Sequence, residues 1–271
     1  MTTGAAVRPP AVAGRFYPAD PRTLAREVDG YLAGAHGSRP SSGVVPKALI
    51  VPHAGYPYSA PIAASGYAAL APARDRIRRV VLLGPAHHVG VAGLAVSSAG
   101  SFATPLGEVP VDCELRDRVL ATGGVSIDDR AHAPEHSLEV HLPFLQRVLA
   151  ELTLLPLVVG HADAGTVAEV LDAVWGGPET LIVVSSDLSH YLDYETAAAR
   201  DRATAAAIVA GRAEVLASDD ACGAAPLRGL LVAAARHGLR AELADLRSSG
   251  DTAGDRARVV GYGAFWFVRS A

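Results

Sequence analysis

The chain has little of what several large protein classes depend on. Two cysteines in 271 residues, Cys113 and Cys222, are too few for a disulfide framework. The net charge is only −4 and Lys and Arg form no run, which argues against a nucleic-acid-binding groove. No apolar stretch approaches the roughly 20 residues of a membrane helix. The N-terminus has no charged region followed by an apolar one, so we expect a cytoplasmic protein without a signal peptide or a membrane partner.

Several motifs that define enzyme classes are also missing. The sequence contains no G-x-x-x-x-G-K-[ST] loop and no G-x-G-x-x-G after an apolar run, so nothing supports nucleotide binding. Without a G-x-S-x-G elbow, a nucleophilic serine lacks support. Neither C-x-x-C nor H-E-x-x-H occurs, which argues against a structural zinc knot and against the usual zinc-protease helix.

What the chain does have is an alternation of apolar runs and helical periodicity. Half of the residues are hydrophobic, enough for a full core. The alternation predicts a single α/β domain over residues 1–271, with a largely parallel central sheet flanked by helices. Strands are expected at 47–51, 79–83, 93–98, 107–111, 152–159, 180–185, 240–247 and 259–268. We expect 93–98 and 107–111 to form a hairpin arm, and the last two strands to pair antiparallel. Helices are expected from Pro21, capped by Asp20, and at 60–70, 113–121, 138–150, 166–174, 194–209 and 226–237.

Histidines follow two of the apolar runs at the same point. His53 comes directly after Ile50-Val51-Pro52, and His87 and His88 follow Leu83-Gly84-Pro85. Proline cannot donate to a sheet ladder, so each strand should end there. Ligands of open α/β sheets bind at the carboxyl ends of strands. Adjacent residues of an extended segment point in opposite directions, so only one of His87 and His88 should face a site.

Two further segments carry residues able to do chemistry. Asp187 and His190 follow the run at 180–185, and a histidine beside a carboxylate is a candidate general acid or base. The alternative is a helix cap with His190 exposed in the first turn. Cys222 lies at the predicted start of a helix, where the free N–H groups favour a thiolate, the form that binds metals. The alternative is a small buried apolar residue.

The segment 134–143 is dense in polar groups interleaved with apolar ones. We interpret Glu135 and His136 as contacts to a substrate or supports for metal ligands, and His141 as the same or a core histidine. His88, and Tyr56 three residues after His53, join this group of candidates.

Together these segments resemble the Memo family. The matching stretches are Pro9–Pro18, PHAGY around His53, GPAHH around His87, EHSLEVHLP, SSDLSHY, CG…P…G around Cys222 and the final VVGYGAFWF. They occur in family order over almost the whole chain. In bacteria and archaea such proteins resemble the B component of the AmmeMemoRadiSam system, which implies AMMECR1-like and radical SAM proteins as partners.

The resemblance also implies a fold and a metal site. The family is similar in fold to class III extradiol dioxygenases of the LigB type, which hold non-haem Fe(II) with two His and one carboxylate. By position, the metal ligands map onto His53, His87 and Cys222, and His190 falls where those enzymes keep an acid/base histidine, with Asp187 beside it. The cysteine departs from the dioxygenase pattern, because a thiolate is softer and can be oxidised.

Three functions follow from this resemblance. The first is a metal-dependent redox protein that holds iron or copper and moves protons through His190. The second is an interaction module whose pocket binds a peptide or small molecule without metal, since animal family members are linked to phosphotyrosine recognition. The third is a true extradiol dioxygenase, although fold does not determine function.

Overall fold

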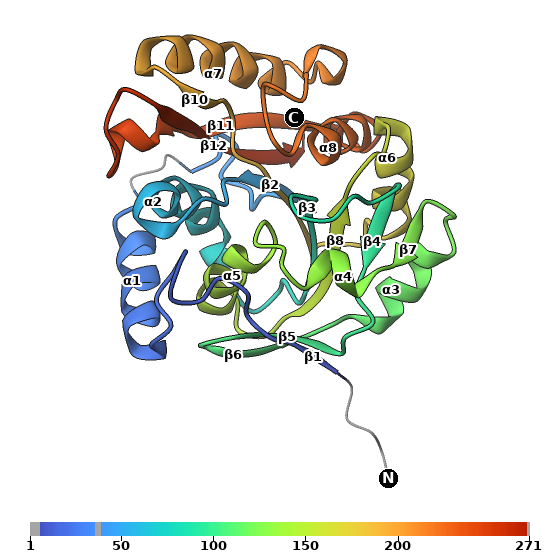
Figure 1. The fold of residues 1–271 in the computed structure, drawn as a ribbon. Coiled ribbons are helices and arrows are strands. Elements are labelled where there is room, and N and C mark those ends of the chain that lie inside the picture. The colour runs from blue at the N-terminus through green and yellow to red at the C-terminus, as the bar shows by residue number, and fades with distance from the viewer. Residues whose placement is uncertain (1–5, 36–38, 270–271) are drawn as a thin grey trace.

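A mixed nine-stranded sheet forms the centre of the protein. The structure is a computed structural model that describes residues 6–35 and 39–269 (Figure 1). Four parallel strands occupy the middle of the sheet in the order β2-β9-β3-β8. Their bounds are β2 (Ala48–Val51), β3 (Arg79–Pro85), β8 (Thr153–Val159) and β9 (Thr180–Ser185). The prediction of an α/β domain with a parallel centre is confirmed.

The sheet continues on both sides with antiparallel pairs. β12 (Val259–Arg269) pairs antiparallel with β2, with β11 (Leu239–Ser248) and with β10 (His190–Leu192). At the other side β4 (Leu94–Val96) runs antiparallel to β8 and parallel to β7 (Val125–Ile127). The expected antiparallel pairing of the last two strands is confirmed.

The hairpin expected from 93–98 and 107–111 is wrong. β6 (Gly107–Pro110) pairs with β5 (Ser101–Thr104), and β1 (Val7–Arg8) completes a separate three-stranded sheet. β4 joins the main sheet instead. The two-residue loop between β5 and β6 is short enough for a hairpin, and Gly107 there has φ +116°, which favours glycine.

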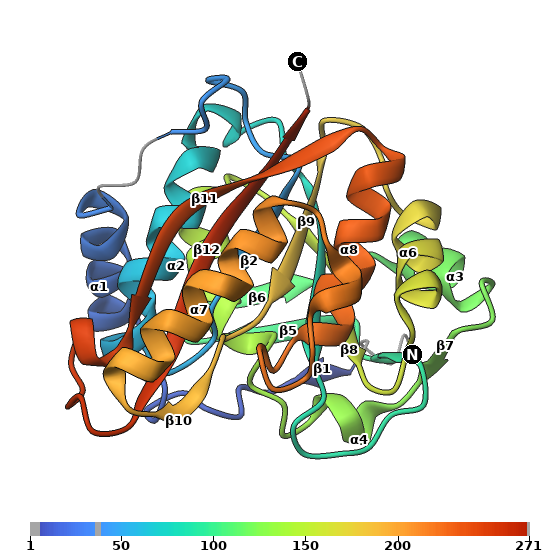
Figure 2. The same ribbon diagram turned by 90° about the horizontal axis from the view of Figure 1, so that it is seen from above.

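Helices cover both faces of the central sheet (Figures 1 and 2). One layer contains α1 (Pro21–Ala33), α2 (Tyr56–Tyr67) and α5 (Leu142–Val148); the other contains α3 (Cys113–Leu120), α6 (Ala164–Ala173), α7 (Tyr194–Val209) and α8 (Ala224–Arg236). Successive strand residues alternate between the two cores: Leu49 and Val51 belong to the first, Ala48 and Ile50 to the second. Both faces are buried, which is why these strands read as continuous apolar runs.

The remaining elements are short. They are α4 (Asp129–His132) and the 3₁₀ helices η1 (Ala68–Ala73), η2 (Glu139–His141), η3 (Ala213–Val215) and η4 (Ser249–Asp251). The helix expected at 138–150 is η2 followed by α5, and the helix expected at 60–70 begins earlier, at Tyr56. Among the described residues, no helix combines the length and the apolarity that crossing a membrane requires.

Strand register brings the predicted chemistry to one edge of the sheet. Val51 at the end of β2 lies beside Ser185 at the end of β9, and Leu83 of β3 lies beside Val184. The segments that follow these strands therefore start at neighbouring points on the same edge. β12 runs the opposite way, so its beginning, with Val260 and Tyr262, lies at this edge too.

Candidate metal centre

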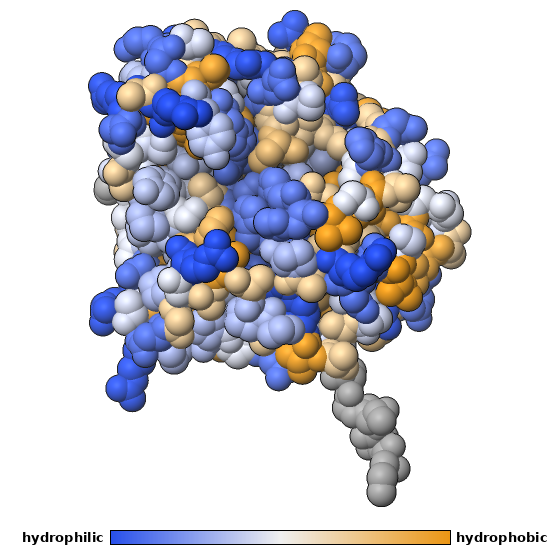
Figure 3. Space-filling model, in the orientation of Figure 1, coloured by the Kyte–Doolittle hydropathy of each residue, from blue (hydrophilic) through white to orange (hydrophobic). Residues whose placement is uncertain are grey.

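A pocket of about 1130 Å³ opens at the carboxyl edge of the parallel strands. Its polar lining includes His53, His87, His136, His190 and Cys222. In the orientation of Figure 1, hydrophilic residues gather near the middle of the visible face, with apolar residues to their right (Figure 3). Side chains from segments more than 150 residues apart in the sequence thus share one cavity.

His53 is held with its Nε2 unprotonated. Its Nδ1 lies 2.6 Å from Ser185 Oγ, and that hydroxyl donates to the carbonyl oxygen of Ser137 at 2.6 Å. Because the hydroxyl has only one proton to give, Nδ1 must donate to it, and Nε2 keeps its lone pair. Burial, and after it the neighbouring His87, holds the pKa of His53 well below its usual value. A neutral imidazole with a free Nε2 is the form that binds metals.

His87 is oriented by a buried carboxylate. Glu135 Oε1 accepts from His87 Nδ1 at 2.8 Å, and Oε2 accepts from the His87 backbone N–H at 2.7 Å. Burial would raise the pKa of Glu135, but these bonds and one from the Ser137 backbone outweigh it and hold the pKa at about 2. The ionised carboxylate fixes Nδ1 as the protonated nitrogen and leaves His87 Nε2 free to bind a cation.

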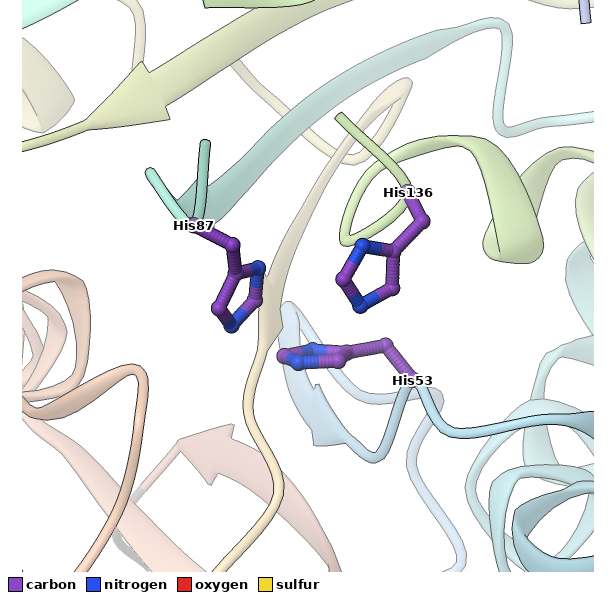
Figure 4. Close-up of side chains that lie close together, drawn as sticks. All are labelled: His53, His87 and His136. Carbon is purple, nitrogen blue, oxygen red and sulfur yellow. The ribbon is translucent and has the colours of Figure 1, made fainter. Parts of the chain in front are cut away.

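His136 forms a triangle with these two histidines. One ligand nitrogen from each of His53, His87 and His136 lies within 4.8 Å of the others. The His136 ring stacks on His87 with centroids 4.6 Å apart and meets His53 edge-on at 5.6 Å. Figure 4 shows the three rings converging from three separate segments. Burial lowers the pKa of His136 to about 4, so its ring is neutral at neutral pH.

Cys222 lies against His53. Its Sγ is 3.4 Å from His53 Nε2 and accepts from the backbone N–H of Asp187 at 3.3 Å. Gly223 permits this approach, because a Cβ there would come within 2.6 Å of the Ser185 carbonyl oxygen. The expectation of a thiol acidified by a helix terminus is wrong. Helix α8 starts only at Ala224, and burial, followed by the Asp187 charge, raises the pKa of Cys222 to about 12.

Asp187 and His190 line the same pocket but do not form the predicted pair. Asp187 Oδ1 accepts from the His53 backbone N–H at 2.8 Å, and burial raises the pKa of Asp187 to about 7. His190 is the first residue of β10 and is exposed, and desolvation by the surrounding pocket lowers its pKa. The strand after residue 189 extends the segment, so no helical turn brings the two side chains together. The helix in the alternative, capped by Ser186 or Asp187, is also wrong, because α7 begins at Tyr194, but the exposed position that it gave His190 is confirmed.

Of the adjacent pair His87 and His88, His87 lines the pocket. His88 is exposed and its ring lies 5.8 Å from His136. Glu135 supports His87 from behind, and the buried His141 donates Nε2–H to Ser185 Oγ at 2.8 Å, beneath His53. Tyr56 does not reach the pocket: it is buried in the core and donates its hydroxyl to the Val140 carbonyl at 2.8 Å.

Several lining residues have no counterpart among the predicted ones. They include aromatic and cationic side chains: Arg15, Phe16, Tyr58, Tyr191, Arg258 and Tyr262. Arg15 and Phe16 lie within the Pro9–Pro18 stretch that matches the family, so the resemblance could have indicated them. Tyr191 has φ +60°, unusual for a bulky residue, and Arg258 lies over its ring at 5.2 Å. No local sequence pattern predicts that Arg258 lines the pocket, because exposed arginines in loops are common.

The donor set fits a transition-metal ion of intermediate softness. A nitrogen about 2.0–2.1 Å and a sulfur about 2.3 Å from a tetrahedral ion lie about 3.5 Å apart. His53 Nε2 and Cys222 Sγ are 3.4 Å apart, and both face the pocket. Imidazole and thiolate are ligands suited to iron, copper or zinc rather than to magnesium or calcium. Because thiolate is the binding form, a cation at Cys222 must displace a proton.

The sequence was compared with known proteins. The family model described as Memo-like protein matches residues 8–266. A MEMO1 family protein of Methanopyrus kandleri is 36% identical, covering 97% of this chain and 99% of that protein. One from Aquifex aeolicus is 37% identical over 94% and 97% of the two chains, and one from Methanosarcina acetivorans 38% over 95% and 98%.

The fold was compared with solved structures. The uncharacterized protein JW3007 of Escherichia coli K12 has a similar fold, with a TM-score of 0.51, 13% identity and coverage of 80% of this chain and 98% of that one. At this identity the likeness concerns the fold alone. The near-complete sequence matches carry the assignment: this chain belongs to the Memo family.

Proposed function

We propose that this chain is a metal-dependent, redox-linked protein that holds iron or copper through His53, His87 and Cys222. The observation that carries the proposal is the 3.4 Å separation of His53 Nε2 and Cys222 Sγ, next to a second imidazole that a buried glutamate orients. Nε2 of each histidine is unprotonated, which supports a ligand role. Partner proteins of the AMMECR1-like and radical SAM kinds belong to the same proposal.

The residues that line the pocket would have different roles around such an ion. The metal would supply electron transfer or polarise a bound oxygen atom. His190, on the pocket wall with a lowered pKa, is neutral at pH 7 and accepts a proton from a bound molecule at a ring nitrogen. Tyr58, Tyr191 and Tyr262 provide aromatic walls that orient a ring or an apolar group and exclude water. Ring cleavage of a catechol is one reaction compatible with this arrangement.

The second candidate is a pocket that binds a peptide or small molecule without metal. The cavity volume favours it, since about 1130 Å³ exceeds what a single ion and its waters need. Arg15 and Arg258, both exposed on the pocket rim, would attract an anionic group. In this case the histidines contact the bound molecule instead of an ion.

Metal content distinguishes the two candidates. Protein purified without oxygen or chelator is expected to contain about one iron or copper per chain by elemental analysis. His53→Ala is expected to lose this metal, because the variant lacks the Nε2 atom proposed as a ligand. Cys222→Ser should lower the metal content, whereas Cys113→Ser, which changes the other free cysteine on α3, should not. Wild-type metal content in both His53→Ala and Cys222→Ser would refute the assignment.

A further inference from the structure

His136 has a free ring in the pocket that the proposed ligand set does not use. Among the described residues, no hydrogen bond to its ring is found, and its Nδ1 lies 3.4 Å from Glu135 Oε1. Phe16 packs on one side, with centroids 4.8 Å apart, and His87 stacks on another. The ring is therefore positioned by aromatic packing, while a nitrogen remains available beside those of His53 and His87 (Figure 4).

The separations among the three imidazoles suit a shared ion. Two nitrogens on one tetrahedral ion lie about 3.3 Å apart. The three ligand nitrogens lie within 4.8 Å of one another before any ion draws them together. The three residues follow β2, β3 and α4, so the sheet edge and the segment at 133–138 supply them independently.

A competing arrangement uses His88, Glu135 and His136, whose ligand atoms also lie within 4.8 Å of one another. The oxygens of Glu135 already accept from His87 N, His87 Nδ1, His136 N and Ser137 N. A carboxylate has about four lone-pair positions, so a cation there would break existing bonds. His87 Nε2 carries no such cost, and His53 Nε2 contacts the Cys222 thiol, whose sulfur the proposed ion would also bind, which favours the three-histidine set.

We propose that His136 is an additional metal ligand, so that three imidazoles form the core of the site and the Cys222 thiolate reaches the ion from beside His53. This inference depends on the proposed metal function and adds one residue to it. Three neutral imidazoles bind a divalent cation of intermediate softness even without the sulfur. The site should therefore keep some affinity when Cys222 is replaced, with different spectroscopic properties.

Cobalt(II) tests the inference, because it replaces iron or zinc in such sites and its spectrum reports both thiolate coordination and coordination number. We would titrate the full chain with Co²⁺ without oxygen. His136→Phe preserves the aromatic stack but removes both nitrogens, and His88→Phe is the matched control on the neighbouring exposed histidine. His136→Phe should raise the Kd for Co²⁺ at least about tenfold, shift the visible bands and keep the thiolate band. His88→Phe should behave as wild type.

The cysteine variant completes the experiment. Cys222→Ser should lose the thiolate band yet still bind Co²⁺, more weakly than wild type, whereas the His136→Phe/Cys222→Ser double variant should lose far more affinity than either single variant. Thermal unfolding in chelator checks that each variant is folded, and His136→Gln serves as a second replacement. Wild-type Kd and visible bands in a folded His136 variant would overturn the inference while leaving the metal function intact. Failure of the wild-type chain to bind Co²⁺ would overturn both.

Discussion

The hydroxyl of Ser185 connects three buried groups beneath the pocket. It donates to the Ser137 carbonyl and accepts from His53 Nδ1 and from His141 Nε2. His53 and His141 are both buried, and burial lowers the pKa of His141 to about 3. One hydroxyl thus sets the protonated nitrogen of two neutral imidazoles. For His53, this is the support that the other ring nitrogen of a proposed metal ligand needs.

Ser185→Ala should weaken metal binding and the fold together. Two buried N–H groups lose their acceptor, and each should cost about 1–3 kcal/mol of unfolding free energy. The freed His53 ring should lower metal affinity about 10–100-fold. Urea unfolding and metal titration measure the two effects. Ser189→Ala is the control, because Ser189 is equally buried but no hydrogen bond joins its hydroxyl to His53 or His141. Equal effects of Ser185→Ala and Ser189→Ala on stability and metal affinity would show that the Ser185 hydroxyl does not orient His53.

At the scale of elements, Glu139 attaches the N-terminal segment 7–17 to the pocket wall. Its carboxylate is fully buried, pairs with Arg8, and accepts from the Ala11 and Val12 backbone N–H groups at 2.7 and 3.0 Å. The Tyr17 hydroxyl donates to it at 2.5 Å. This segment carries Arg15 and Phe16 to the pocket rim. A carboxylate in the middle of the sequence therefore holds a segment more than 100 residues before it.

Glu139→Gln should loosen that attachment. The glutamine amide would place its NH₂ group, a hydrogen-bond donor, next to the N–H and O–H donors that now bind the carboxylate. It would also leave Arg8 without its counter-charge, which should cost about 3–5 kcal/mol of unfolding free energy. Hydrogen exchange should rise selectively in residues 7–17. Glu151→Gln is the control, because Glu151 forms an exposed ion pair with Arg78. The Glu151 side chain is 79% exposed and that of Arg78 56%, so this variant should lose less than about 1 kcal/mol of unfolding free energy. Unchanged exchange in the N-terminal segment of Glu139→Gln would contradict this account.

At the scale of the whole molecule, the protein buries several imidazoles in the neutral form. Burial lowers the pKa of His132 to about 4, and it lowers those of His136 and His141 as well. His132 lies away from the pocket, in α4, and donates Nε2–H to the Ala95 carbonyl at 3.0 Å. Between the unfolded pKa near 6.5 and the folded value near 4, the unfolded chain binds a proton that the folded chain does not. The contribution of His132 to stability therefore falls as pH falls through this range.

The contribution of His132 can be measured by difference. His132→Gln removes one titrating group, so the unfolding free energy of wild type relative to the variant should decrease from pH 7 to pH 4, by at most about 3 kcal/mol. Urea unfolding of both proteins at several pH values gives that difference directly, and groups common to both, such as Asp187, cancel. A difference that stays constant or grows on acidification would show that His132 does not titrate in this way.

Local sequence determined the parts of this protein that depend on short-range chemistry. Apolar runs at 47–51, 79–83 and 180–185 became buried parallel strands, because both faces of such a sheet are covered. Asp20 and Pro21 begin α1 as predicted, since a cap and a first-turn proline act within four residues. His53 and His87 at strand ends could be predicted as neighbours, because parallel strands end at one edge of the sheet.

The tertiary structure decided what depends on contacts between distant segments. No sequence pattern pairs β6 with β5 rather than β4, extends His190 into β10, or buries Cys222 so that its pKa rises. The place of His136 beside His53 and His87, and of Tyr56 in the core, likewise follows from packing across the whole domain. The burial of a residue and the electric field at it depend on neighbours that only folding brings together. The identity of a side chain therefore predicts its chemistry but not its surroundings.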